Sequence, residues 1–209
     1  MKKIGVRMSE QYRNAPAWSP GDVLYFGPGS RALACFGDVS REAGLVLVSQ
    51  ILELDQRGND PITLHINTDG GILGDALAIY DTLRSVDSPV VTIATGVCAS
   101  AGLLLLSAGD LRLSNENTTF FYHQPVVPGD VIASTECMLS HSNMYELSRD
   151  RYDGILYEKS NLSKETWVKE FAGRTSKYFT PQQAMDYGLI DGLISSKKKK
   201  GKLKLKWRE

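Results

Sequence analysis

Hydrophobic positions along the chain follow two spacings that take turns. Over residues 62–67 apolar and polar residues alternate strictly, which predicts a β-strand with one buried face. Over residues 39–53 apolar residues recur every three or four positions behind Ser40, a residue typical of a helix start, which predicts an amphipathic helix. The same patterns predict further strands at 31–36, 89–95, 111–113, 118–122 and 189–194, and further helices at 76–83, 103–106, 131–158 and 181–187.

Strand, glycine turn and helix follow one another repeatedly before the long helical stretch. This order predicts an α/β fold with a mainly parallel sheet. Two of the turns are rich in glycine and small residues, namely Asp69-Gly70-Gly71 and the stretch 96–102. Sites in parallel sheets form at the carboxyl ends of the strands. These two turns, and the strand that ends at His123, are therefore the candidate positions for chemistry.

Ser100 lies where the strand at 89–95 gives way to the apolar helix. A nucleophile at this place would have the free backbone N–H groups of the helix start beside it. The alternative is a small polar residue or an N-cap at a buried junction. A serine nucleophile also needs a base. Of the three histidines only His123 ends a strand pattern, whereas His65 lies within a strand and His141 within the long helix. From the residues alone, His123 is either structural or catalytic.

The composition favours a cytoplasmic protein and argues against a secreted or membrane-spanning one. With 209 residues, 42% of them hydrophobic and 23% charged, the chain has the size and composition of one soluble globular domain. Its three cysteines (Cys35, Cys98 and Cys137) lack metal-ligand spacing, and their odd number favours a reducing, cytoplasmic setting. The N-terminus lacks the apolar core of a signal peptide, and the apolar runs are too short to span a membrane. We therefore expect no membrane association.

The formal net charge is zero, but the charge is unevenly spread. Residues 197–209 hold seven Lys and one Arg against one Glu, which leaves the rest of the chain acidic. Such a run is typical of a disordered, solvated tail. Contact with nucleic acid or an acidic partner and pairing of the alternating Lys and Leu residues as a strand are the alternatives. We assign no function to the tail.

Five motifs, in order, resemble those of the ClpP-type proteolytic subunits, serine peptidases that degrade proteins inside a closed chamber. Residues 66–71 are similar to the family's I-N-S-P-G-G, 79–83 to its I-Y-D-T-M, and 96–102 to its G-x-A-A-S-M-G nucleophile segment. His123-Gln124-Pro125 matches H-Q-P, and 187–191 is similar to Y-G-L-V-D. The resemblance covers roughly residues 32–194. It implies a ClpP/crotonase-like fold of repeated β-β-α units with a protruding handle helix at 131–158.

The resemblance also implies roles for individual residues. Ser100 matches the nucleophile, His123 the general base, and the backbone N–H groups of Gly71 and Ala101 the oxyanion hole. It implies no metal or cofactor. The implied assembly is a ring oligomer of stacked heptamers, which takes unfolded polypeptides or peptides as substrates. A substrate would bind as an added strand near Gly129. ATP would enter only through an AAA+ unfoldase partner, since the chain contains no G-x-x-x-x-G-K-[ST].

One departure from the family pattern concerns the third member of the triad. Ser176 stands where the family carries Asp, eleven residues before Tyr187. A hydroxyl can orient the histidine ring but brings no charge, and a neutral group that favours the wrong tautomer costs about 10⁴ in rate in chymotrypsin-like enzymes. The enzyme is then slow, completed by another residue or a water, or inactive. The intact Ser100 and His123 favour some activity. Asp69 for the family's Pro and Ala101 for its Met are smaller departures beside the oxyanion hole.

The sequence thus predicts a divergent N-terminal segment at 1–30, a ClpP-like serine peptidase domain at 31–194 and a basic tail at 195–209. The predicted function is a serine endopeptidase working inside an oligomeric chamber, with its activity attenuated at Ser176. The alternative is a catalytically weak assembly or regulatory subunit. A crotonase relative acting on acyl-CoA thioesters is less favoured because of the ClpP-like spacing of Ser100 and His123. Residues 1–30 do not clearly resemble the family's axial loop, which leaves the docking of an unfoldase open.

Overall fold

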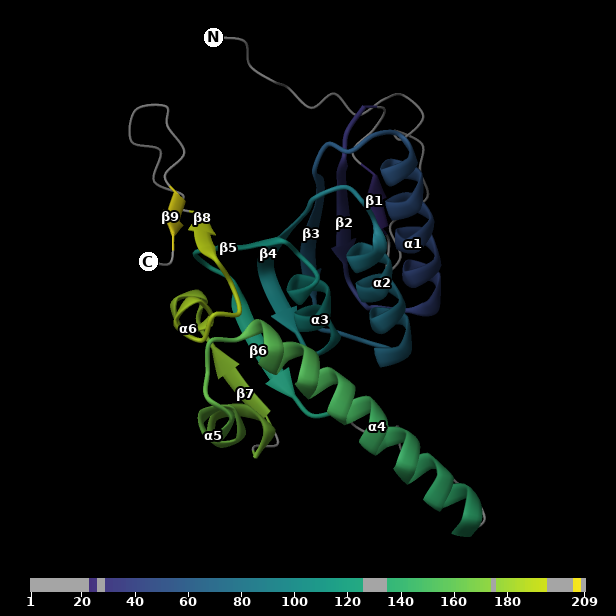
Figure 1. The fold of residues 1–209 in the computed structure, drawn as a ribbon, viewed down its shortest axis with the longest axis vertical. Helices are drawn as coiled ribbons and strands as arrows, with labels where there is room; N and C mark the ends of the chain where they lie inside the picture. Colours follow the sequence, from purple (N-terminus) through teal and green to yellow (C-terminus); the bar gives the residue numbers. More distant parts are fainter. Residues whose placement is uncertain (1–22, 26–28, 126–134, 174–175, 195–204, 208–209) are drawn as a thin grey trace.

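A single mixed sheet organises the part of the chain that the structure, a computed structural model, describes: residues 23–25, 29–125, 135–173, 176–194 and 205–207 (Figure 1). The strand order is β1-β2-β3-β4-β5-β8-β9, and β6 and β7 branch off at β4. The strands are β1 (Val23–Tyr25), β2 (Ala32–Phe36), β3 (Ile62–Thr68), β4 (Val90–Ala99), β5 (Leu111–Asn115), β6 (Thr119–His123), β7 (Ser176–Phe179), β8 (Gly192–Ile194) and β9 (Leu205–Trp207).

The central strands are parallel, as the repeated strand–helix order predicts. β2, β3, β4, β5 and β8 run parallel to their neighbours in this series, and β6 runs parallel to β4. The antiparallel pairs lie at the margins, where β1 pairs with β2, β7 with β6 and β9 with β8. β3 is buried at every second position, which is the alternation read from residues 62–67.

Helices cover the sheet in sequence order and end in a long arm. The helices are α1 (Arg41–Gln56), α2 (Leu73–Ser85), α3 (Ala101–Ser107), α4 (Thr135–Lys159), α5 (Lys164–Trp167), the π-helix η2 (Val168–Ala172) and α6 (Pro181–Asp186). α1 packs on α2, α2 on α3, and α3 on α4. Every residue of α3 is buried, as its apolar sequence predicts. Figure 1 shows α4 running away from the body of the molecule, in the manner expected of a handle helix.

A bulge in β4 turns this strand from one partner to another. β4 pairs with β5 through Val91–Ala94 and with β6 only from Val97 onward. The register against β3 shifts in between, where Gly96 adopts φ +69°. The Oδ1 of Asn67 accepts a hydrogen bond from the Val97 N–H (2.9 Å). A Cβ built on Gly96 would be only 2.7 Å from this Oδ1. The bulge therefore needs glycine at 96, and it directs the end of β4 toward β6.

Most predicted elements are present, with shifts at their ends and one strand that the sequence pattern missed. β7 was not predicted, and it pairs with β6 so that Ser176 lies opposite His123. The strand predicted at 189–194 is shorter, because the N–H groups of Leu189 and Ile190 bond to the carbonyl of Ala184 at the end of α6 and not to a neighbouring strand. The first residues of the helix predicted at 131–158, and Gly129 with its expected substrate strand, lie outside the described residues.

The basic tail contains a strand. β9 pairs antiparallel with β8, with Leu205 opposite Ile194 and Trp207 opposite Gly192. The expectation of a purely solvated tail is therefore wrong for Leu205–Trp207, where the alternating pattern forms an edge strand. In the described residues, no helix combines the length and the apolar character needed to cross a membrane.

Candidate active site

Ser100 sits on a strained turn with no linker between β4 and α3. Its backbone adopts φ 51° and ψ −121°, and it is the only described residue other than glycine with a positive φ. Such strain costs on the order of 1–3 kcal/mol and persists only where the surroundings hold it. The surroundings here are specific: the Ser100 N–H donates to the carbonyl of Phe121 (2.8 Å), and the Ser100 carbonyl accepts from Leu103 N–H (2.9 Å) and from the hydroxyl of Tyr152 (3.1 Å).

The Ser100 hydroxyl does not cap the helix that it precedes. Ser100 occupies the N-cap position of α3, yet its side chain makes no capping hydrogen bond. The structure therefore does not support the N-cap interpretation of this serine. The first N–H groups of a helix have no hydrogen-bond partner within the helix. In α3 these are the N–H groups of Ala101 and Gly102, which follow Ser100. A side chain on a sharp strand-to-helix turn is presented outward, which is the geometry of a nucleophile elbow.

The glycine doublet after β3 lies directly against Ser100. A Cβ built on Gly70 would be 2.6 Å from Cβ of Ser100 and 3.1 Å from its Oγ, and Gly70 adopts φ +111°. The Gly70 N–H donates to the Oγ1 of Thr68 (3.0 Å), and the Gly70 carbonyl accepts from Val39 N–H (2.8 Å). Gly71 (φ +149°) is pressed on Val39, whose carbonyl would be 2.3 Å from an added Cβ. Both glycines are thus required by close backbone approach.

The parallel pairing of β4 and β6 brings His123 to the same place. Ala99 pairs with Phe121, so Ser100 is one residue beyond this pair and His123 two residues beyond it, at the carboxyl ends of adjacent strands. The Nδ1 of His123 lies 2.6 Å from the carbonyl oxygen of Gln124. The His123 ring is half-buried and lies beside the Phe121 ring, with 5.4 Å between the centroids.

Ser176 lies directly opposite His123 across the β6–β7 pair. Side chains of directly opposed residues point to the same face of a sheet, so Ser176 and His123 share a face of the β6–β7 pair. The next pair on this face is Phe121 with Tyr178, whose rings stack at 4.2 Å. Ser176 is exposed, and no hydrogen bond joins it to His123.

A polar cluster of Tyr152 and Asp153 from α4 and Tyr122 from β6 lies beside the junction. Tyr152 donates to the Ser100 carbonyl, and Tyr122 donates to Oδ1 of Asp153 at 2.6 Å. Burial raises the pKa of both tyrosines well above its ordinary value, so both hydroxyls stay protonated and remain donors at any working pH. Burial also raises the pKa of the Asp153 carboxyl. α4 is therefore hydrogen-bonded to the Ser100 backbone, a link that no sequence signal in this long helix predicts.

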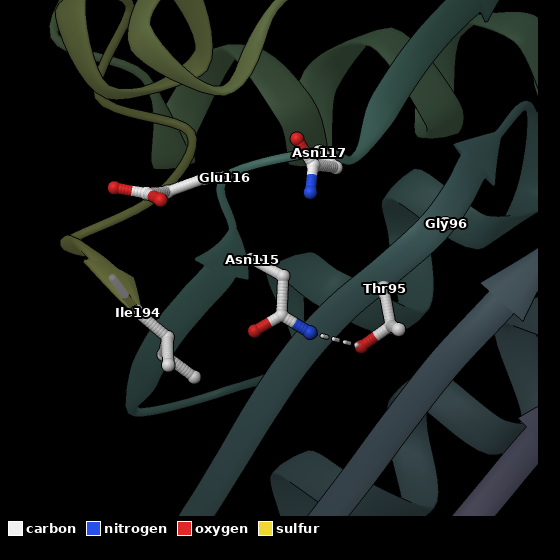
Figure 2. Close-up of a pocket in the computed structure, with 6 residues that line it drawn as sticks. All are labelled: Thr95, Gly96, Asn115, Glu116, Asn117 and Ile194. Atoms are coloured by element: carbon white, nitrogen blue, oxygen red, sulfur yellow. Dashed lines mark hydrogen bonds between the residues drawn. The ribbon is translucent and has the colours of Figure 1, made fainter. Parts of the chain in front are cut away.

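A hollow of about 280 Å³ lies at the β4 bulge and is separate from these residues (Figure 2). It is lined by Thr95, Gly96, Asn115, Glu116, Asn117 and Ile194. Figure 2 shows the side chain of Asn115 pointing to Thr95, to whose Oγ1 it donates at 3.0 Å. Neither Ser100 nor His123 lines this hollow, so its position gives no argument about catalysis.

The five residues that the sequence assigned to the site lie at or just beyond the ends of neighbouring elements. Gly71 follows β3, Ser100 joins β4 to α3, which begins at Ala101, His123 ends β6, and Ser176 begins β7 opposite His123. The sequence reading missed the roles of Tyr152, of the Asn67-filled bulge and of the Gln124 carbonyl. Cys98, two residues before Ser100, is fully buried, and burial keeps its thiol protonated by raising its pKa. Among the described residues no cluster of His, Cys, Asp or Glu could hold a metal ion.

The site combines a serine on a strained strand–helix turn with helix N–H groups, a glycine loop and a histidine at the end of the adjacent parallel strand. This arrangement is typical of a serine hydrolase built on an α/β fold. A family comparison gives the particular family. The model of the Clp protease family matches residues 29–197, and the chain belongs to this family of serine endopeptidases.

Two relatives support the assignment. The ATP-dependent Clp protease proteolytic subunit of Ligilactobacillus salivarius (strain UCC118) is 34% identical over 172 residues, which make up 81% of this chain and 85% of the relative. Among solved structures, a mutant of ClpP1 from Listeria monocytogenes matches with a TM-score of 0.71 at 25% identity, over 80% of this chain and 92% of that one. The resemblance inferred from the five motifs, and the fold that it implied, are thereby confirmed.

Proposed function

We propose that the chain hydrolyses peptide bonds with Ser100 as nucleophile and His123 as general base. The observation that carries this proposal is the Ser100 backbone, held at φ 51° by its N–H bond to Phe121 while its hydroxyl is left out of the helix cap. A fold keeps such strain only where the surroundings enforce it, and strain of this kind clusters at active sites.

In the proposed mechanism, Nε2 of His123 removes the proton of the Ser100 hydroxyl as Oγ attacks the substrate carbonyl. The oxyanion is stabilised by the backbone N–H groups of Ala101, which follows Ser100, and of Gly71, which follows the Gly70 that packs on Ser100. His123 then gives the proton to the leaving amine, which produces an acyl-enzyme, and a water activated in the same way releases the peptide. Removal of one oxyanion donor costs about 10²–10³ in kcat in other serine hydrolases. The positions of Gly70 and Gly71 against Ser100 and Val39 support this arrangement.

The test is hydrolysis of a short fluorogenic peptide that carries an aminocoumarin leaving group. We expect the wild type to release the coumarin and the Ser100→Ala variant to fall to the uncatalysed background. The matched control is Ser49→Ala, which removes an exposed helix hydroxyl bonded to the carbonyl of Leu45, far from the site in sequence. It should keep the wild-type rate. Equal rates for the wild type and Ser100→Ala would contradict the proposal.

Such equal rates would favour the second candidate, a catalytically weak assembly or regulatory subunit. The specific observation in its favour is Ser176, an uncharged residue in the position opposite His123. The family match gives no support to an acyl-CoA-acting crotonase relative.

For the assembly we propose a ring oligomer of this chain, with two stacked heptamers as the finer form, in the cytoplasm and with an AAA+ unfoldase as partner. The name of the Ligilactobacillus relative, a subunit of an ATP-dependent protease, supports this proposal. So do the projecting α4 and the exposed apolar residues Met144 (53% exposed) and Leu147 (59%) along it. Native mass spectrometry gives the subunit number: a fourteen-subunit particle is expected, and a monomer at working concentration would contradict the proposal.

A further inference from the structure

The histidine of a serine hydrolase needs an acceptor on Nδ1, and this chain offers one that is not a carboxylate. The Nδ1 of His123 lies 2.6 Å from the carbonyl oxygen of Gln124. A carbonyl can only accept a hydrogen bond, so a contact this short places the proton on Nδ1. In the neutral ring the lone pair is then on Nε2, the nitrogen that must take the proton of Ser100.

Two restraints fix the direction of the Gln124 carbonyl: the proline that follows it and the anchored side chain of Gln124 itself. Pro125 follows, and a proline confines the residue before it to extended conformations. The Gln124 side chain is anchored as well, since its amide donates to the carbonyl of Ala172 at 2.5 Å. Ala172 closes the π-helix η2 just before β7. The end of β6 is thus tied to the segment that leads into Ser176.

Ser176 does not compete for this role in the structure. It is exposed, it carries no charge, and no hydrogen bond joins it to His123 although the two residues are paired across β6 and β7. A carbonyl dipole orients the ring as a carboxylate does, but stabilises an imidazolium less because it has no full charge. The His123 ring is therefore oriented by a group that carries no negative charge.

We propose that Gln124 is the positioning residue of this site: its main-chain carbonyl fixes the Nδ1–H tautomer of His123, and its side chain, anchored on Ala172, holds that carbonyl in place. This inference rests on the proposed peptidase function for its kinetic consequences. It accounts for an active site without a third carboxylate, and it makes the Gln124 side chain a determinant of kcat although it does not touch the reacting atoms.

The first test compares Gln124→Leu with wild type in hydrolysis of the fluorogenic peptide. Loss of the anchor should lower kcat by about tenfold or more with KM within about twofold, because the ring loses its orientation while substrate contacts stay. The matched control is Gln182→Leu, which removes another side-chain amide donor, one that bonds to Asp186 on the exposed face of α6. It should keep the wild-type kcat.

The second test separates positioning from a loss of stability. Ser176→Asp puts a carboxylate opposite His123, and in this background the carboxylate orients the ring in place of the carbonyl. Gln124→Leu should then cost much less than it does in the wild type. His123 must be unprotonated to act as general base, so a carboxylate beside it should also move the acidic limb of the pH profile of kcat/KM to higher pH. An equal loss in both backgrounds, or a wild-type kcat for Gln124→Leu, would overturn the inference.

A third measurement does not depend on activity. The Ser100→Ala variant is labelled with ¹⁵N-histidine, and the ring ¹⁵N chemical shifts of His123 are assigned by comparison with the Ser100→Ala, His123→Gln double variant. At neutral pH these shifts should show that Nδ1 is protonated and Nε2 is not. Addition of Gln124→Leu should give a mixture of the two tautomers. An unprotonated Nδ1 would overturn the inference. A protein that shows the expected tautomer but no peptide hydrolysis would contradict the proposed function alone.

Discussion

Replacement of Gly70 by alanine tests how the two glycine-rich turns make the site. Gly70 adopts φ +111°, and its added Cβ would be 2.6 Å from Cβ of Ser100 and 3.1 Å from both the Ala99 carbonyl oxygen and the Ser100 Oγ. Carbon atoms in contact are ordinarily about 3.5–4.0 Å apart. The overlap with Ser100 is therefore about 1 Å, and it falls on rigid groups at a strand end rather than on the tip of a flexible side chain.

The magnitude follows from two separate effects. The left-handed backbone costs an alanine about 1–3 kcal/mol of stability, and overpacking adds about 1–3 kcal/mol. Relief of the overlap moves Ser100, and a displacement of about 1 Å in an active site costs about 10²-fold in rate. We expect Gly70→Ala to lower the kcat/KM for the fluorogenic peptide by about 10²-fold, together with a lower denaturation midpoint.

Two control substitutions separate the strain from the displacement. Gly58 has φ +141° but nothing within 4 Å of its Cβ position, so Gly58→Ala carries the strain without the clash. Gly74 lies in α2 with open space around it, so Gly74→Ala carries neither and should be slightly stabilising, because alanine is the better helix former. Both should keep kcat/KM within about twofold. A Gly70→Ala variant with wild-type kcat/KM, or a Gly58→Ala variant as impaired as Gly70→Ala, would show that the clash with Ser100 does not control the rate.

Three further predictions concern stability and the support of the site. Ser100→Gly should be more stable than Ser100→Ala by about 1 kcal/mol in urea denaturation, because glycine adopts φ 51° without strain and both variants lack the hydroxyl. Tyr152→Phe should lose about 1 kcal/mol and a few-fold in kcat, because the hydroxyl that holds the Ser100 carbonyl is gone. Hydrogen bonds from the Ser88 hydroxyl and, to a lesser extent, from the Ser88 N–H hold the pKa of the Asp55 carboxyl below its ordinary value. The Asp55 carboxylate therefore adds stability that is present above about pH 4 and is lost as the pH falls through the lowered pKa. Ser88→Ala should therefore have a lower midpoint than wild type at pH 7, and the gap should close in acid.

Each of these three predictions has an outcome that contradicts it. Equal midpoints for the two Ser100 variants would mean that the turn is unstrained. A Tyr152→Phe variant indistinguishable from wild type in midpoint and kcat would separate α4 from the site. A difference in denaturation midpoint between Ser88→Ala and wild type that widens in acid would show that ionisation of Asp55 does not stabilise the fold through Ser88.

The parts of the fold that the sequence predicts are those whose signal is local. β3 alternates residue by residue, α1 begins behind Ser40, whose hydroxyl accepts from Ala43 N–H (3.2 Å), and the apolar run after Ser100 is a wholly buried helix. These patterns come from the chain's own periodicity and capping. The positions of the candidate site residues follow, because parallel strands bring their carboxyl ends to one edge.

The parts that the sequence misses depend on contacts between distant residues. β7 has four residues and no regular alternation, with Phe179 buried and Ser176 exposed, and it becomes a strand by pairing with β6. The β4 bulge depends on Asn67 of the neighbouring strand. The contact of Tyr152 with Ser100 spans 52 positions, and an apolar position in a helix gives no signal of such a contact.

The most direct test of the account is the identity of the residue that reacts with a fluorophosphonate. The folded protein is treated with the reagent, digested and analysed by peptide mass spectrometry. We expect one adduct, on Ser100, that disappears in Ser100→Ala and forms far more slowly in His123→Ala, because the proposed base that takes the proton is gone. The absence of an adduct from the folded wild-type protein, or an adduct on a different serine, would contradict the claim that Ser100 is the nucleophile.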